Sequence, residues 1–114
     1  MIKVDEITCD DFLCAEVARK LNEKCKEYQL PDPYYCVGRV GENEYFTTLE
    51  AAEGSMLLDI VPTYSFYQLA DLAEDLKFID SELLNKAREY TDKGFRPIVV
   101  FAYLIMYYFE NKSR

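Results

Sequence analysis

Histidine and tryptophan are absent from this chain of 114 residues, and glycine and proline occur only four times each. Without histidine, the commonest general base and the usual partner of a serine or cysteine nucleophile are both missing. The glycines form no phosphate-binding loop, because Gly38 and Gly41 match neither the P-loop nor the dinucleotide-binding pattern. We therefore expect a protein that is not an enzyme and that carries no cofactor.

Long apolar runs are lacking as well. The most apolar stretch, Ile98 to Phe109, has 12 residues, whereas a helix that spans a membrane needs about 20. Residues 1–6 turn acidic where a secretory signal would begin its apolar run. We expect neither a membrane span nor a signal peptide, and therefore a cytoplasmic protein.

The four cysteines form no close pair. Cys9, Cys14, Cys25 and Cys36 contain no C-x-x-C spacing, whereas structural zinc sites usually contain such close pairs, and the chain has no histidine. Nothing in the sequence indicates the oxidising compartment that disulfides require. The interpretation is therefore four free thiols in or near the core, with no metal site and no role in binding.

Positive charge is missing between Val40 and Leu76, a segment without lysine or arginine. The segment carries eight carboxylates, and the remaining 13 acidic residues balance the 13 basic ones, so it accounts for the whole net charge of −8. A block of one sign repels anions and attracts basic surfaces. We expect a basic protein surface as the partner, and neither direct nucleic-acid binding nor membrane binding. The eight candidate partner-binding residues are Glu42, Glu44, Glu50, Glu53, Asp59, Asp71, Glu74 and Asp75.

What the chain does contain is enough apolar material for one core. Half of its residues are hydrophobic, and ten tyrosines and seven phenylalanines are among them. This composition and length predict a single compact domain over residues 1–114.

The first half of the chain predicts a helix followed by strands. Thr8 suits a helix N-cap, and apolar residues recur every three or four positions from there to Tyr28. Residues 34–40 and 44–49 predict a β-hairpin across a turn at 41–43. Residues 49–53 favour helix, whereas 56–61 allow a third strand that Pro62 would end.

The second half predicts three helices. Ser65 and Gln68 form a capping-box pattern before a helix that runs to about residue 77. Ser81 caps the next helix, and Gly94 suits its end. Pro97 suits the first turn of a last helix to about residue 111, although its β-branched start leaves a buried strand as the alternative. The predicted fold class is α+β, with an N-terminal helix, a small antiparallel sheet and three C-terminal helices; the alternative is all-α.

Two helix faces suggest surfaces of interaction. Asp71, Glu74 and Asp75 are neighbours on one helix, where like charges cost a few tenths of a kcal/mol each, so this face is either acidic for solubility or a docking face. The last helix places Arg96, Tyr103, Tyr107 and Glu110 on one stripe that mixes aromatic and charged side chains. Such mixtures are typical of interfaces, so this stripe either meets water or forms a second interface, including one in a homodimer.

Three functions follow from these patterns. The first is a small acidic, non-enzymatic protein that docks on a basic protein surface, as phage and mobile-element inhibitors do when they imitate nucleic acid in anti-defence systems. The second is a small accessory or regulatory subunit that assembles through its C-terminal helix. The third is a carboxylate-dependent enzyme, which would need a pocket that separates two pKa values.

Overall fold

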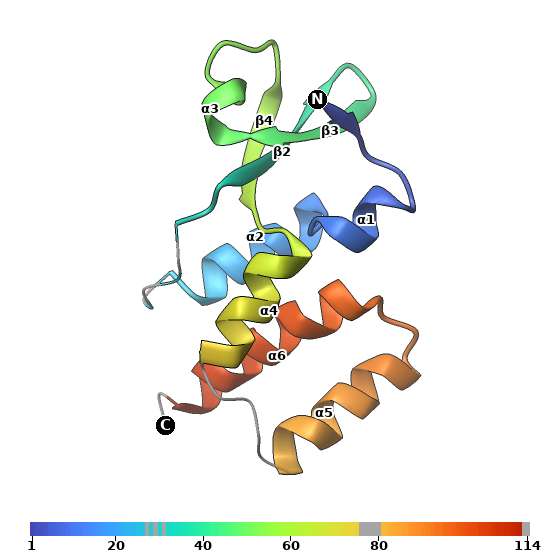
Figure 1. Ribbon diagram of the computed structural model, residues 1–114, viewed down its shortest axis with the longest axis vertical. Helices are drawn as coiled ribbons and strands as arrows, with labels where there is room; N and C mark the ends of the chain where they lie inside the picture. Colours follow the sequence, from blue (N-terminus) through green and yellow to red (C-terminus); the bar gives the residue numbers. More distant parts are fainter. Residues whose placement is uncertain (27, 29, 31, 76–80, 113–114) are drawn as a thin grey trace.

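The computed structural model describes residues 1–26, 28, 30, 32–75 and 81–112. A four-stranded antiparallel sheet and the helices confirm the predicted α+β class. The molecule measures 44 × 29 × 19 Å, and the sheet occupies one end of its long axis (Figure 1). The helices that follow the sheet in sequence form the other end.

The predicted hairpin is the centre of the sheet. Strands β2 (Tyr35–Val40) and β3 (Asn43–Thr48) pair in register from Tyr35 opposite Thr48 to Val40 opposite Asn43. The turn between them contains Gly41, whose φ of 61° favours glycine. Strand β1 (Ile2–Lys3) joins the outer side of β3, and the order is β1-β3-β2-β4.

The segment after the hairpin contains both predicted elements. Helix α3 (Leu49–Ala52) begins at Thr48, whose hydroxyl accepts a hydrogen bond from the amide of Ala51. Strand β4 (Leu58–Thr63) then pairs with β2. The prediction that Pro62 ends this strand is wrong. A proline lacks an N–H donor but is tolerated on an edge strand, and β4 is at the edge of the described sheet.

The predicted N-terminal helix is broken into two. Helix α1 (Thr8–Asp11) and helix α2 (Ala15–Lys24) are separated by an extended segment. In this segment the amide of Leu13 donates to the carbonyl of Tyr64, and the ring of Phe12 packs at 5.1 Å from that of Phe46. These contacts with distant residues replace the hydrogen bonds of a continuous helix.

The three predicted C-terminal helices are present as α4 (Phe66–Asp75), α5 (Ser81–Asp92) and α6 (Pro97–Lys112). The capping box is confirmed: the amide of Ser65 donates to Gln68, and the amide of Gln68 donates to Ser65 Oγ. Gly94 follows α5 with a φ of 86°, as its predicted role requires. Residues 98–112 are helical, so the strand alternative is wrong.

The main core lies between one face of the sheet and the helices. Val37, Phe46 and Val61 supply the sheet side, whereas Leu21, Leu69 and Ile105 come from α2, α4 and α6. A smaller cluster on the other face joins Cys36 to Ala52 and Leu57. A third cluster joins α5 to the second apolar side of α6 through Leu83, Val100 and Leu104.

The cysteine prediction is right for two residues and wrong for two. Cys25 and Cys36 are free and buried, as expected. Cys9 and Cys14 form a disulfide instead of remaining thiols. Their proximity follows from the break between α1 and α2, which the helical periodicity did not predict.

Candidate interaction surface

The end of the molecule formed by residues 39–60, here called the sheet end, concentrates negative charge. It includes the β2–β3 turn, β3, α3 and the start of β4, which lie together at one extreme of the long axis (Figure 1). Five carboxylates and one arginine give it a net charge of −4. The neighbouring strand β1 adds one cation, Lys3. Half of the net charge of the chain is therefore gathered here.

Four of the five carboxylates at the sheet end are exposed and form no ion pair with another described residue. These are Glu42, Glu44, Glu50 and Glu53. The fifth, Asp59, accepts a 2.5 Å hydrogen bond from Arg39 Nε, and Arg39 also donates to the carbonyl of Gly41. The only arginine of the sheet end is thus already occupied, so the four glutamates keep their charge available to a partner.

Exposed apolar side chains lie among these carboxylates. The exposed fractions are 37% for Val40, 83% for Met56, 56% for Leu58 and 42% for Ile60. Three of the four lie at the end of β2: Val40 is its last residue, Leu58 is opposite Arg39, and a Cβ on Gly38 would lie 3.4 Å from Ile60 Cγ1. Single exposed apolar side chains are ordinary, but four of them within one acidic end resemble the mixed composition of an interface.

The remaining predicted acidic residues belong to α4, away from the sheet end (Figure 1). Asp71 is exposed, and Tyr67, one turn earlier, is 80% exposed. Glu74 and Asp75 occupy the last turn of α4, and their side chains lie outside the part of the structure that is described. The structure therefore divides the eight acidic residues into two groups.

The predicted stripe on the last helix makes contacts within the chain. Arg96 donates to the carboxylate of Asp10 at 2.8 Å and to the carbonyl of Glu6. Tyr103 stacks on Phe95 at 5.3 Å and accepts a hydrogen bond from Lys20 Nζ.

Tyr107, on the same stripe, donates its hydroxyl proton to Glu82 on α5 and lies under Lys86 Nζ, which is 5.3 Å from its ring centroid. Glu110 is exposed near the end of α6. Helix α5 and the loop after it therefore contact both tyrosines of the stripe that we considered as a second interface.

Sequence reasoning missed the exposed apolar residues of the sheet end and Tyr67. The run from Met56 to Val61 contains five apolar residues in six, which indicates a buried strand. Only Leu57 and Val61 of that run are buried. A bulge opposite Gly38 interrupts the alternation, and Asp59 takes a positive φ of 52° there. A bulge of this kind leaves no periodic signal in the sequence.

The cleft that Cys25 lines does not activate its thiol. Cys25 lines a cleft with Asn22, Lys26 and Tyr64, but burial raises the pKa of its thiol to about 11. Such a thiol remains protonated at neutral pH and is a poor nucleophile. Among the described residues, no three metal-binding side chains are close enough to hold an ion.

Comparisons with known proteins do not assign this chain to a family. No protein-family model matches the chain, and no curated protein or solved structure matches it either. Within the described residues, no helix combines the length and the apolar character needed to cross a bilayer.

Proposed function

We propose that this protein is a small, non-enzymatic binding protein that docks through its sheet end on a basic surface of another protein. One observation carries the proposal: four exposed glutamates without ion-pair partners among the described residues share the sheet end with four exposed apolar side chains. A surface that serves only solubility needs the charges but gains nothing from Met56 or Leu58. An interface uses both, since apolar contacts supply affinity and charges supply steering.

The apolar component also bears on the kind of partner. A protein that imitates a phosphate array presents carboxylates to the phosphate-binding residues of its target. Here Leu58 and Ile60 are exposed on either side of Asp59 in β4, which favours a partner with an apolar patch bordered by lysine or arginine. In one form of this proposal the partner is a nucleic-acid-binding protein. The lysines and arginines that border its apolar patch then also bind nucleic acid, and docking inhibits that binding.

The C-terminal helix supports the proposal less well than the sheet end does. Tyr103 and Tyr107 already contact Phe95 and Glu82 within the chain. An accessory subunit that assembled through this stripe would have to compete with those contacts. We therefore place the primary interface at the sheet end, with Asp71 and Tyr67 on α4 as the nearest alternative.

The test is affinity capture from the native host, compared among variants of equal charge. Glu42→Lys with Glu53→Lys reverses two exposed charges at the sheet end, and Glu16→Lys with Glu23→Lys reverses two on α2. We expect the wild type and the α2 variant to retain the same partner at low salt, and the sheet-end variant to lose it. Retention should also fall as salt rises, because exposed charges are screened.

A second pair of variants tests the apolar component. Met56→Ser with Leu58→Ser should weaken capture, whereas Ile7→Ser with Leu84→Ser, which are also exposed, should not. If the sheet-end and α2 charge variants lose the partner equally, the binding depends on net charge alone and not on the sheet end. If Asp71→Lys alone abolishes capture while the sheet-end variants retain the partner, the interface lies on α4 and the proposal is wrong.

A further inference from the structure

The disulfide between Cys9 and Cys14 closes a very short loop over the break in the N-terminal helix. Cys9 is in α1, Cys14 is the N-cap residue of α2, and their Cα atoms are 6.0 Å apart. Both residues are partly exposed, whereas Cys25 and Cys36 are buried. A reductant in solution can therefore reach this pair and not the other two thiols.

Helix α1 has little else to hold it. It contains four residues and buries none of them, and an isolated helix of that length is unstable in water. Asp5 supports its start, since Asp5 Oδ1 accepts hydrogen bonds from the amides of Ile7 and Thr8. The disulfide ties its middle to α2.

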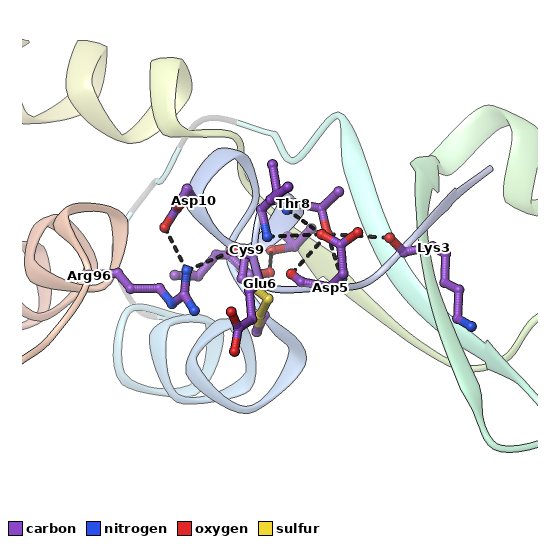
Figure 2. Close-up of a disulfide and its surroundings, with 11 residues drawn as sticks. Lys3, Asp5, Glu6, Thr8, Cys9, Asp10 and Arg96 are labelled. Atoms are coloured by element: carbon purple, nitrogen blue, oxygen red, sulfur yellow. Dashed lines mark hydrogen bonds and ion pairs between the residues drawn. A yellow bond between two sulfur atoms is a disulfide. The ribbon is translucent and has the colours of Figure 1, made fainter.

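One tertiary contact completes the attachment. Arg96, just before α6, points toward α1 and donates to the carbonyl of Glu6 and to the carboxylate of Asp10 (Figure 2). The ion pair is exposed, so its contribution is small and falls with salt. Without the disulfide, α1 would keep this contact and its own cap, and it would stay joined to Phe12 and Leu13, which remain packed on Phe46 and bonded to Tyr64.

We propose that Cys9 and Cys14 are a reversible redox pair, and that a dithiol reductant opens the bond between them and releases α1 from α2. This inference does not depend on the proposed function. It rests on the partial exposure of both cysteines and on α1 being a four-residue helix that buries none of its residues.

The exchange takes two steps. A thiolate of the reductant attacks Cys9 Sγ, a mixed disulfide forms, and the electron pair of the broken bond leaves with Cys14 Sγ, which takes a proton from water. The second thiolate of the reductant then attacks the reductant sulfur of the mixed disulfide, and Cys9 leaves and is protonated. The protein gains two electrons and two protons, and the dithiol becomes a disulfide.

The position of Cys14 favours attack at Cys9 Sγ with Cys14 Sγ as the leaving group. As the N-cap of α2, it adjoins the amides of the first turn, and its side chain makes no capping hydrogen bond in the oxidised protein. A leaving thiolate at a helix N-terminus is stabilised by those amides and by the helix dipole. This stabilisation makes Cys14 the better leaving group of the two cysteines.

Amide hydrogen exchange, with thiol alkylation and mass spectrometry, tests the proposal. We expect exchange at the amides of Cys9 and Phe12, which bond to Asp5 and Thr8, to rise on the order of tenfold on reduction with dithiothreitol. Amides in the middle of α6 should not change. The Cys9→Ser, Cys14→Ser double variant should exchange like the reduced protein whether or not reductant is present.

Titration in glutathione buffers tests reversibility. We expect alkylation of two thiols after oxidation and of four after reduction and denaturation, with the change occurring within the range that glutathione covers. Four free thiols under oxidising buffer, a bond that no glutathione ratio opens, or equal exchange of α1 in the two states would each overturn the proposal.

Discussion

The hydroxyl of Thr63 donates a 2.6 Å hydrogen bond to the carbonyl of Leu13, and both residues are fully buried. The amide of the same leucine donates to Tyr64, so Leu13 is held through both of its backbone groups. These two bonds attach the break between α1 and α2 to the end of β4. They explain why a sequence with helical periodicity from residue 8 onward does not form one helix.

Replacement of Thr63 by valine should therefore destabilise the protein. The shape is kept, but the buried carbonyl of Leu13 loses its partner, and we expect a loss of about 1–3 kcal/mol in the free energy of unfolding. Urea denaturation measures it. Thr91→Val is the matched control, because the hydroxyl of Thr91 also donates to a carbonyl but is exposed. An equal effect of the two variants would contradict the role given to Thr63.

Gly38 should not tolerate a side chain. A Cβ there would lie 3.0 Å from Leu57 Cβ and 3.3 Å from the carbonyl oxygen of Leu58, so Gly38→Ala forces the strands apart. We expect a loss of about 1–3 kcal/mol, as for other overpacked sites. Gly54→Ala has open space and serves as the control, with an expected change near zero or a gain of about 0.4–1 kcal/mol. Thermal denaturation distinguishes them, and a neutral Gly38→Ala would show that β2 and β4 can separate freely.

Tyr103 and Tyr67 should differ sharply in their effect on stability. Tyr103 lies 5.3 Å from Phe95 and 5.5 Å from Tyr90, ring centroid to centroid, whereas Tyr67 is 80% exposed. We expect Tyr103→Ala to cost roughly 1–3 kcal/mol, since it removes aromatic contacts between α5 and α6. Tyr67→Ala should stay within about 0.5 kcal/mol. If chemical denaturation gives similar small values for both, the stripe on α6 is a free surface after all.

Alkaline pH should destabilise the protein through Cys25. Burial raises the pKa of its thiol from 9.0 to about 11. Between these values the thiol ionises in the unfolded chain and remains protonated in the folded one. Ionisation therefore lowers the free energy of the unfolded state alone, and the free energy of unfolding falls as pH rises. The free energy of unfolding, measured with the disulfide intact from pH 8 to 11, should decline less steeply in Cys25→Val than in the wild type. If the free energy of unfolding declines equally in the two proteins, Cys25 is not the cause of the alkaline destabilisation.

Local signals predicted much of the fold. The hairpin follows from aromatic and β-branched residues and from Gly41, and α4 follows from the capping-box pattern of Ser65 and Gln68. Each of these depends on residues that are neighbours in the chain. The acidic character of the sheet end was also evident, because Glu42 to Asp59 are close in sequence.

Contacts between distant residues decided the rest, and no local pattern contains them. Leu13 is 50 residues from Thr63, and their bond breaks the first helix and brings Cys9 to Cys14. Pro62 could continue β4 because that strand is at the edge of the described sheet. Leu58 lies opposite Arg39 because a bulge shifts the register of β4. The sequence by itself determined the helices, the hairpin and the location of the charge, since these depend on local geometry and composition. The tertiary structure decided which of those elements are interrupted, paired or left exposed, because burial and long-range hydrogen bonds outweigh local preference.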